Sequence, residues 1–397
     1  MASEQPFATR LRALAAYAEA ELTTRILPFW ARLHDQERGG FFGEADHAGR
    51  PDATAAKGTV LQARILWTFA TSGARYRRPD WLALAEAAYR FLAEALYDQA
   101  RGGLRWTVQA DGSAADERKH VYAQAFGIYG LSAYYAATAD APALRLAQSL
   151  FRTIEARAAD QIYGGYFESF GAAWDLRPNE LMGLAQAPKT VNTHLHLLEA
   201  YASLWAVWPD RALRLRIEAL LTLLTGLAFD AQAQSFRPYF QANWLYFPAG
   251  RSFGHDIEGS WLLAQAADAL GVASVRPALA GIAEAVGRQA LDRYGGVIEG
   301  MNVAGAPVRL KIWWVQAEAA VGFLDAFEQT GDMRFLDATE AVWRFIDQVL
   351  IDREQGEWLS EATGAERLPK ATLWKCPYHN GRACLETVAR VARMVGR

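Results

Sequence analysis

Polar side chains that can move protons stand within strongly apolar stretches of this chain. Histidine is the most informative of them, because imidazole titrates near neutral pH and can act as a base at one position and as an acid at another. At similar intervals along the chain the candidates are Arg64, Lys119, Tyr122, Asn192, His196, His255, Glu258, Trp314, Glu318, His379 and Arg382. We expect these groups to point into one shared cavity.

The spacing of the candidates favours helices that present them on one face. Asn192, His196 and Glu199 are separated by four and then three residues, so they share a face, whereas His194 lies on the other side. His196 is therefore the stronger candidate of the two histidines. The same spacing joins Arg64 with Trp67, His255 with Glu258, Trp314 with Glu318, and His379 with Arg382.

Histidines opposed across a cavity suit proton transfer without a metal. A proton beside a carbonyl group can leave one face of a carbon atom while another proton arrives on the opposite face, which inverts the configuration of that carbon. Arg64, Asn192 or Arg382 could stabilise the enediolate oxygen that develops negative charge.

A metal centre is the main alternative for the same residues. His194 and His196 resemble a chelating pair, but on a helix their rings diverge, because two ligands on one face are three or four residues apart. His196, His255, His379 and Glu258 could still bind zinc or manganese if the fold brings them together. We expect no metal and no cofactor. The sequence also lacks a nucleophile elbow, a P-loop and a dinucleotide fingerprint.

Several of these residues also have a purely structural interpretation. A lone histidine in an apolar helix is more often a satisfied core residue, and Lys119 could be only a surface charge. Trp67 and Trp261 are expected to pack in the core. Trp313 and Trp314 are adjacent, so we expect one of them to face the core.

The helices that must position these groups belong to a repeat of about 60 to 70 residues. An aspartate followed by a glycine pair begins at Asp35, Asp98, Asp160 and Asp292, with degenerate copies at Asp230 and Asp352. Two amphipathic helical patterns lie between successive copies, and each glycine turn leads into a short aromatic or β-branched run. This period predicts an all-α fold, an (α/α)6 barrel of six repeated helix pairs with short β-hairpins at one end. An open α-solenoid is the alternative.

The composition describes a soluble protein with a large core. Of 397 residues, 52% are hydrophobic and 21% charged, with a net charge of -3. We expect one catalytic domain over residues 1–397. Because Lys and Arg are scattered among Asp and Glu, neither nucleic acid nor a membrane is a predicted partner. The amphipathic start and the two cysteines, Cys376 and Cys384, predict a cytoplasmic protein. We expect a monomer or a homodimer.

In these same segments the chain resembles the N-acylglucosamine 2-epimerase superfamily, and within it the cellobiose 2-epimerases. The resemblance covers essentially the whole chain, through KGTVLQARILWTFA, YAQAFGIYGLS, APKTVNTHLHLLEAY, SFGHDIEGSWLL, WWVQAEAAVGF, GEW and WKCPYHNGRACLE. Two positions depart from the family pattern, Val191 where Met is usual and Ala202 where Thr is usual. Neither is one of the proposed acid and base groups.

The resemblance implies a metal-free isomerase that reversibly inverts C2 of the reducing-end glucose in β-1,4-linked disaccharides such as cellobiose and lactose. By the same resemblance, His255 and His379 would be the acid/base pair, and His196 would assist ring opening. The small-molecule sugar would be bound by Arg64, Tyr122, Asn192, Glu258, Trp314, Glu318, Trp374 and Arg382.

Other activities remain open from the sequence alone. A mannose 2-epimerase, an N-acylglucosamine 2-epimerase and an aldose-ketose isomerase share much of this pattern. A carbohydrate hydrolase or lyase would need two opposed carboxylates, for which Glu258 and Glu318 are candidates, but it would leave the histidines unexplained. A sugar-binding or protein-binding member without activity is a further alternative, which the presence of both His255 and His379 disfavours.

Overall fold

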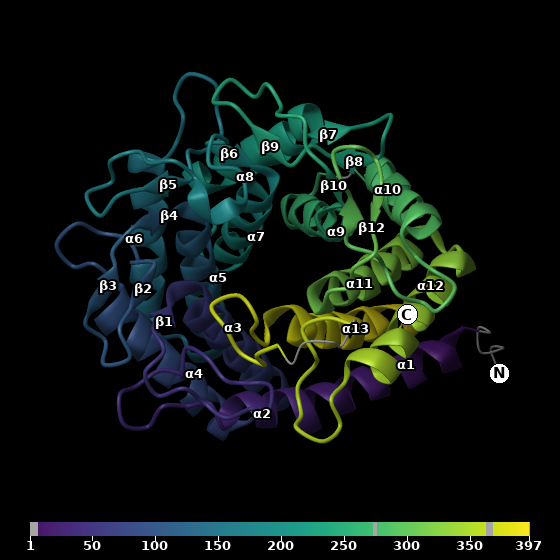
Figure 1. Ribbon diagram of the computed structural model, residues 1–397, viewed down its shortest axis with the longest axis horizontal. Helices are drawn as coiled ribbons and strands as arrows, with labels where there is room; N and C mark the ends of the chain where they lie inside the picture. Colours follow the sequence, from purple (N-terminus) through teal and green to yellow (C-terminus); the bar gives the residue numbers. More distant parts are fainter. Residues whose placement is uncertain (1–6, 273–275, 363–367, 397) are drawn as a thin grey trace.

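The computed structural model describes residues 7–272, 276–362 and 368–396. Within these ranges it is an (α/α)6 barrel, with an inner ring of helices inside an outer ring (Figure 1), as the sequence predicts. The inner helices are α3 (Thr59–Tyr76), α5 (Val121–Thr138), α7 (Val191–Val207), α9 (Phe253–Leu270), α11 (Trp313–Thr330) and α13 (Tyr378–Val395). The outer helices are α1 (Ala8–Glu21) with α2 (Leu27–Ala31), α4 (Pro79–Phe91), α6 (Ala141–Arg157), α8 (Arg211–Leu223), α10 (Arg276–Gln289) and α12 (Met333–Phe345).

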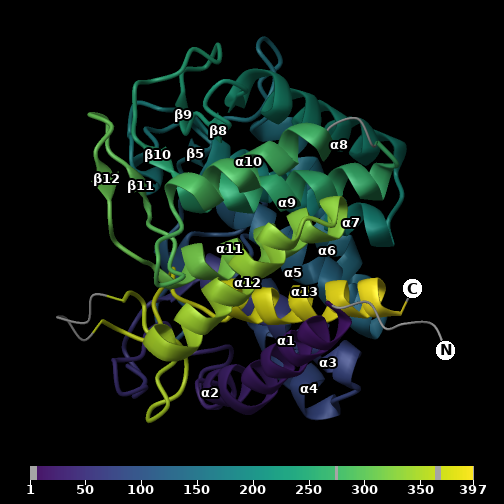
Figure 2. The same cartoon turned by 90° about the vertical axis from the view of Figure 1, so that its right-hand side faces the viewer.

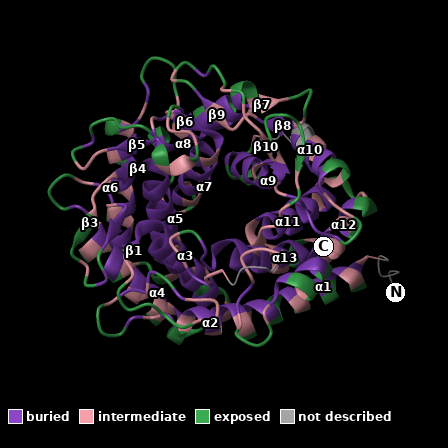
Figure 3. Ribbon diagram, in the orientation of Figure 1, coloured by how far each residue is buried: buried purple, intermediate pink, exposed green. Residues whose placement is uncertain are grey.

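Burial explains why the two rings differ in sequence. Every residue from Thr59 to Ala70 of α3 is buried, since an inner helix is covered on all sides. A helix that is apolar all round belongs in such a position. The outer helices bury one stripe and expose the other, which gives the mixture of colours along the outer ring in Figure 3. A polar group on an inner helix therefore needs a partner or a cavity.

Short strands gather at one end of the barrel, whereas the end of α13 lies at the other (Figure 2). The first turns of the inner helices therefore face the strands. The strands are β1 (Lys57–Gly58), β2 (Thr107–Val108), β3 (Ala114–Asp116), β4 (Lys119–His120), β5 (Ser169–Phe170), β6 (Lys189–Thr190), β7 (Phe229–Asp230), β8 (Ser235–Phe236), β9 (Tyr239–Phe240), β10 (Arg251–Ser252), β11 (Gly300–Met301) and β12 (Pro307–Val308).

Antiparallel pairing joins each unit to the next. The strand before an inner helix pairs with the strand after the glycine turn of the following unit, as in β1–β2, β4–β5, β6–β9 and β10–β11. Single bridges make the last two joints, between Ile312 and Glu361 and between Ala45 and Ala371. The last joint connects the sixth unit to the first, so the ring is closed and the open solenoid is excluded.

The outer helix α1 also completes the ring, because it fills the place beside α12 and α13. Arg10 donates from Nε to Oε1 of Glu340 at 2.8 Å, and the Tyr17 hydroxyl donates to Asp347 at 2.6 Å. The first helix of the chain therefore serves as the outer partner of the last inner helix.

A buried ion pair fastens most of the glycine turns. The aspartate that opens the turn accepts from a lysine just before the inner helix, as Asp35 does from Lys57 at 2.7 Å and Asp98 from Lys119 at 2.9 Å. Asp160 pairs with Lys189 in the same way, and Asp292 forms a partly exposed pair with Lys311. In the sixth unit Asp352 pairs with Lys370, which stands eight residues before α13. Lys119 is fully buried in its pair with Asp98, so the alternative that it is a surface charge is wrong.

Lys119→Met is expected to lower the free energy of unfolding by about 3 kcal/mol near neutral pH, the low end for a broken buried pair, since Asp98 keeps only longer ion pairs with Arg101 at 3.5 Å and Arg105 at 3.7 Å. Although burial alone would raise it, the Lys119 ammonium and nearby backbone N–H groups lower the pKa of Asp98 from 3.8 to about 2. The contribution of the pair is therefore complete above about pH 4 and is lost as the pH falls through about 2. Chemical denaturation at neutral and at acid pH measures the free energy of unfolding of each protein. The values for the variant and the wild type are expected to converge at acid pH.

A matched control lies in the fourth unit, where the aspartate has a different partner. Asp230 pairs with Arg237 at 2.7 Å, and both side chains are about one-third exposed. Asp230→Asn is therefore expected to cost at most about 1 kcal/mol. Equal losses in the two variants would contradict the assignment of the Lys119 pair as a buried one.

Candidate active site

The basic residue before each inner helix defines a common register for all six units. These residues are Lys57, Lys119, Lys189, Arg251, Lys311 and Lys375. Seven positions later stand Arg64, Phe126, His196, Glu258, Glu318 and Arg382. One helical turn earlier in this register stand Tyr122, Asn192, His255, Trp314 and His379. The predicted groups therefore occupy two layers of one ring.

The position five residues after the basic residue has a structural role. Gln62, Gln124 and Gln316 use their amides to bind both the N–H and the C=O group of the residue after the glycine turn. His194 stands at this position, and its Nε2 accepts from the backbone N–H of Tyr166 at 3.0 Å. It is thus directed away from the centre of the ring, as its helical phase predicts.

The five residues of the layer that lies one helical turn earlier, together with Arg64, His196 and Glu258 of the other layer, line a cavity of about 240 Å³, here called the inner chamber. Its lining consists of Arg64, Tyr122, Asn192, His196, His255, Glu258, Trp313, Trp314, Trp374 and His379. Both adjacent tryptophans contribute, so the expectation that one of them faces the core is wrong. Glu318 and Arg382 do not line the chamber but are buried behind it, where Glu318 contacts His379 and Arg382 contacts Glu258.

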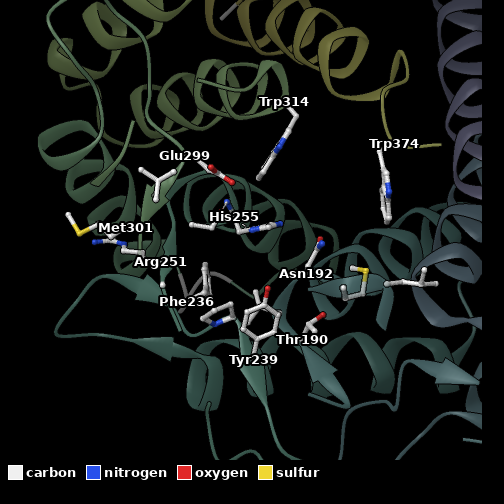
Figure 4. Close-up of a pocket in the computed structure, with 18 residues that line it drawn as sticks. Thr190, Asn192, Phe236, Tyr239, Arg251, His255, Glu299, Met301, Trp314 and Trp374 are labelled. Carbon is white, nitrogen blue, oxygen red and sulfur yellow. Dashed lines mark hydrogen bonds between the residues drawn. The ribbon is translucent and has the colours of Figure 1, made fainter. Parts of the chain in front are cut away.

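A second cavity of about 420 Å³, the outer pocket, adjoins the inner chamber. The two share Asn192, His255, Trp314 and Trp374, whose side chains converge in Figure 4. The remaining wall of the outer pocket comes mainly from loops and short strands, and includes Leu181, Met182, Phe236, Tyr239, Arg251, Glu299 and Met301. None of these residues was predicted from the sequence as a site residue.

Arg382 holds three carboxylates together beneath the inner chamber. Its Nη2 donates to Oε1 of Glu258 at 2.6 Å and to Oε1 of Glu318 at 2.7 Å, and its Nη1 donates to Glu199. The guanidinium also stacks on the Trp261 ring at 4.6 Å. Trp261 is buried, as expected for a core residue, and its indole N–H donates to Oε2 of Glu318 at 3.1 Å.

Burial and charge separate the pKa values of these carboxyls. Burial and the neighbouring Glu318 carboxylate raise the pKa of Glu258 to about 7, and burial also raises the pKa of Glu318. Burial would raise the pKa of Glu199 as well, but the Arg382 cation and further donors lower it to about 2. One carboxyl of the cluster is thus a fixed anion while another titrates near neutral pH.

His379 has one ring nitrogen fixed by this cluster. Its Nδ1 lies 2.6 Å from Oε1 of Glu318, and its ring lines the inner chamber. Burial, reinforced by the positive charges of Arg64 and Arg382, lowers the pKa of His379 well below its ordinary value of 6.5. In the neutral ring, an Nδ1–H that donates to the carboxylate leaves the Nε2 lone pair free to accept a proton.

His255 stands two inner helices away and is held differently. Its Nδ1 lies 2.9 Å from the hydroxyl oxygen of Ser252, the residue that also caps the start of α9. Burial and the nearby His196 ring lower the pKa of His255 to about 4. Trp314 lies near both catalytic candidates, with ring centroids 4.9 Å from His255 and 5.6 Å from His379.

Arg64 brings a positive charge to the chamber wall. Its Nη2 donates to the Tyr122 hydroxyl at 2.7 Å, and its guanidinium stacks on Phe126 at 4.1 Å and on Tyr378 at 4.7 Å. In the part of the chain that the structure describes, no carboxylate lies within ion-pair distance of Arg64. Its charge is therefore available to an oxyanion in the chamber.

His196 reaches the chamber from α7. Its Nδ1 lies 3.0 Å from Oε2 of Glu199, which also accepts from the Tyr378 hydroxyl at 2.6 Å. Neither Glu199 nor Tyr378 was predicted as a site residue. The spacing in the sequence places Glu199 on the helical face of His196, which was a signal for its role. Tyr378 gives no such signal, because its sequence context does not distinguish it from an aromatic residue of the core.

The geometry answers two alternatives from the sequence. Glu258, Glu318 and His379 offer ligand atoms within 4.8 Å of one another, but Arg382 already donates to both carboxylates and His379 contacts Glu318. These contacts favour an ion-pair network over a metal centre. Because Glu258 and Glu318 share one Arg382 nitrogen, they lie side by side rather than opposed across a substrate, as a hydrolase would require.

No helix in the described residues is both long and apolar enough to cross a membrane.

The chain is similar over most of its length to curated enzymes. The cellobiose 2-epimerase of Bacteroides fragilis is 38% identical over 93% of this chain and 97% of its own, and that of Ruminococcus albus is 36% identical over 93% and 97%.

The solved structure of the cellobiose 2-epimerase from Bacillus thermoamylovorans superposes with a TM-score of 0.92 at 37% identity, covering 96% of this chain and 100% of that one. A family model for N-acylglucosamine 2-epimerase (GlcNAc 2-epimerase) matches residues 40–383, a range that contains His196, His255, His379 and the Arg382 cluster. The chain therefore belongs to the N-acylglucosamine 2-epimerase family and is an enzyme of the epimerase and isomerase class.

Proposed function

We propose that the enzyme inverts C2 of the reducing-end glucose of β-1,4-linked disaccharides, converting cellobiose to glucosyl-mannose and lactose to epilactose. The observation that carries the proposal is the pair His255 and His379. They occupy the same position of the repeat on α9 and α13, face one chamber, and have separate hydrogen-bond partners. Epimerisation through an enediolate needs two such groups, one for each face of C2.

The proton path follows from how the rings are held. With its Nδ1–H on Glu318, the neutral His379 ring takes the C2 proton at Nε2, and the C2 electrons form the enediolate with the adjacent carbonyl group. His255 must be protonated to return a proton to the opposite face of C2, and because its pKa in the free enzyme is about 4, it takes that proton from solvent as negative charge develops on the bound sugar. The two rings have then exchanged protonation states, and the reverse reaction uses them in the opposite order.

Charge on the enediolate is met by Arg64 and Asn192. Arg64 has no carboxylate partner among the described residues, and Asn192 lines the inner chamber with its side-chain amide. Preorganised donors of this kind contribute roughly 10²- to 10³-fold to rate. We assign His196 to ring opening of the sugar. Its Nδ1 is held by Glu199, so its Nε2 is the ring nitrogen that faces the chamber.

The outer pocket favours a disaccharide over a monosaccharide as the substrate. It continues from the inner chamber through Trp314 and Trp374, and Trp374 is 38% exposed at the boundary. Flat aromatic faces of this kind stack on the C–H groups of sugar rings. One sugar in the inner chamber would therefore leave room for a linked second sugar in the outer pocket.

The test is incubation in heavy water with cellobiose, lactose, mannose and N-acetylglucosamine, followed by NMR and separation of epimer from ketose. Deuterium at C2 with formation of the C2 epimer of a disaccharide is expected. A ketose as the main product would favour the aldose-ketose isomerase instead. If none of the sugars gains deuterium at C2, the epimerase proposal is wrong.

Activity is expected to survive exhaustive chelation, because Arg382 supplies the positive charge that the carboxylate cluster needs. The measurement is C2 exchange after dialysis against EDTA, with metal content followed by emission spectrometry. Activity that disappears with the metal and returns with zinc or manganese would contradict this.

We further propose a single catalytic domain that works as a monomer or homodimer. A cytoplasmic location is proposed because the two cysteines are free and buried, as is usual in a reducing compartment.

A further inference from the structure

The glycine turn of the sixth unit contains a side chain at a place where the first three turns exclude one. Gly40, Gly103 and Gly165 have φ values of +63°, +78° and +72°, and a Cβ atom on any of them would come within 2.6 Å of a neighbouring ring. The sixth unit has Glu357 at the corresponding place, with φ of +64° and a buried side chain. A left-handed conformation is unfavourable for a residue other than glycine, so contacts of the Glu357 side chain must offset it.

Four donors converge on the Glu357 carboxylate. Oε1 accepts from the Lys375 ammonium at 2.7 Å, from the Asn380 amide at 2.6 Å and from the backbone N–H of Trp358 at 2.8 Å. Oε2 accepts from the indole N–H of Trp30 at 2.6 Å. Lys375 is buried with it, so this is a fully desolvated ion pair with further hydrogen bonds.

Two of these donors bracket His379 along the chain. Lys375 comes four residues before it, and Asn380 follows it directly in the first turn of α13. Lys375 also lies over the ring of Trp313, a wall of the inner chamber, at 5.2 Å. The Glu357 carboxylate therefore fixes the chain on both sides of a residue that lines the chamber.

The repeat shows why the sixth unit needs this carboxylate. Asn380 stands five residues after Lys375, where other units have a glutamine that binds the backbone of the turn directly. Asparagine is one methylene shorter, and its amide instead donates to Glu357, which accepts from the turn at Trp358 N–H. The Glu357 carboxylate thus connects Asn380 to the turn, a connection that the longer glutamine side chain makes directly in three other units.

We propose that Glu357 is a positioning residue that sets the first turn of α13 and thereby the contact between His379 Nδ1 and Glu318 at 2.6 Å. It touches no substrate and acts through Lys375 and Asn380. The kinetic consequence rests on the proposed function, because it assumes that His379 exchanges the C2 proton.

The test is Glu357→Gly, which restores the residue that the left-handed backbone prefers and removes the carboxylate. The expected result is a roughly tenfold to hundredfold fall in kcat for C2 exchange, since small displacements of a catalytic group have effects of this size. KM is expected to stay within about threefold, because the chamber lining is intact. Glu357→Gln, which keeps the volume and one accepting oxygen, is expected to lose less.

Lys370→Met is the matched control, because Lys370 holds the backbone of the same turn, through Asp352, Gly356 O and, at 3.4 Å, Glu357 O, but contacts neither the Glu357 carboxylate nor the segment around His379. It is expected to lower stability while kcat of the folded enzyme changes little. Wild-type kcat in the folded Glu357→Gly and Glu357→Gln enzymes, or an equal loss in Lys370→Met, would overturn the proposal.

A second readout does not depend on activity. In protein labelled with ¹⁵N-histidine, the ring nitrogen shifts of His379 report its tautomer and its hydrogen bond to Glu318. They are expected to change in Glu357→Gly and to stay unchanged in Lys370→Met. If wild type fails to epimerise any sugar, the proposed function is wrong, but unchanged His379 shifts in Glu357→Gly would still overturn the positioning role.

Discussion

His379→Ala is expected to lower kcat for C2 exchange by roughly 10²- to 10⁴-fold, the range that a general acid or base contributes. The Nε2 atom of His379 is the acceptor that Glu318 holds ready in the inner chamber, and water in the space left by alanine has no such orientation. His255→Ala is expected to have an effect of similar size, since each face of C2 requires its own group. Deuterium incorporation at C2 measures both.

His194→Gln is the matched control for these variants. It also changes a buried histidine on an inner helix, but His194 holds the turn at Tyr166, and glutamine has the same role in three other units. Exchange at the wild-type rate is therefore expected. Wild-type turnover in His379→Ala, or a loss in His194→Gln as large as that in His379→Ala, would contradict the assignment.

The pH dependence gives an independent check of His379. Burial and the nearby guanidinium groups lower its pKa well below 6.5, so its basic form persists into mildly acid solution. The acid limb of kcat/KM that reports this base is therefore expected below the ordinary histidine range. A limb centred at or above 6.5 would show that the free enzyme uses a different base.

Much of the architecture was predictable because the repeat leaves marks in the sequence. The Asp-Gly-Gly turns require left-handed backbone at positions such as Gly40, and the apolar periods between them require helices. Helical phase also separated His196, which lines the inner chamber, from His194, which holds a turn. Each of these inferences depends on residues close together in the chain, where local geometry is fixed.

The parts that were missed depend on contacts between distant residues. Lys119 gives no sign in the sequence that Asp98, in a turn 21 residues earlier, removes it from solvent. Trp313 and Trp314 both line the chamber because they stand at the very start of α11, where the helix end is open to the cavity. The outer-pocket residues Tyr239 and Glu299 stand at positions that recur in the repeat, but the residue types at those positions change from unit to unit, so no pattern in the sequence marks them.

Replacement of Arg382 is expected to have the largest effect on the free energy of unfolding. Arg382→Met keeps much of the side-chain volume but leaves the carboxylates of Glu199, Glu258 and Glu318 without their shared cation. Removing one partner of a buried pair typically costs 3–5 kcal/mol, and here three partners share the one removed, so a loss of about 5 kcal/mol or more is expected near neutral pH. Denaturation in urea measures it.

The pH dependence of this loss has a definite sign. Without the cation, burial raises the carboxyl pKa values in the folded state above their unfolded values, so folding takes up protons. The variant is therefore expected to recover stability as the pH falls from about 8 to about 5, where those carboxyls become neutral. A loss that grows toward acid pH would contradict this account of the cluster.

Arg390→Met provides the control on the same helix. Arg390 is also buried and pairs with Asp325 at 2.5 Å and Glu328 at 3.0 Å, but it lies two turns beyond Arg382 and away from the inner chamber. Both variants are expected to lose stability, yet only Arg382→Met should also lose C2 exchange per folded molecule, because Arg382 holds the Glu318 that orients His379. Full exchange in folded Arg382→Met would separate the carboxylate cluster from catalysis.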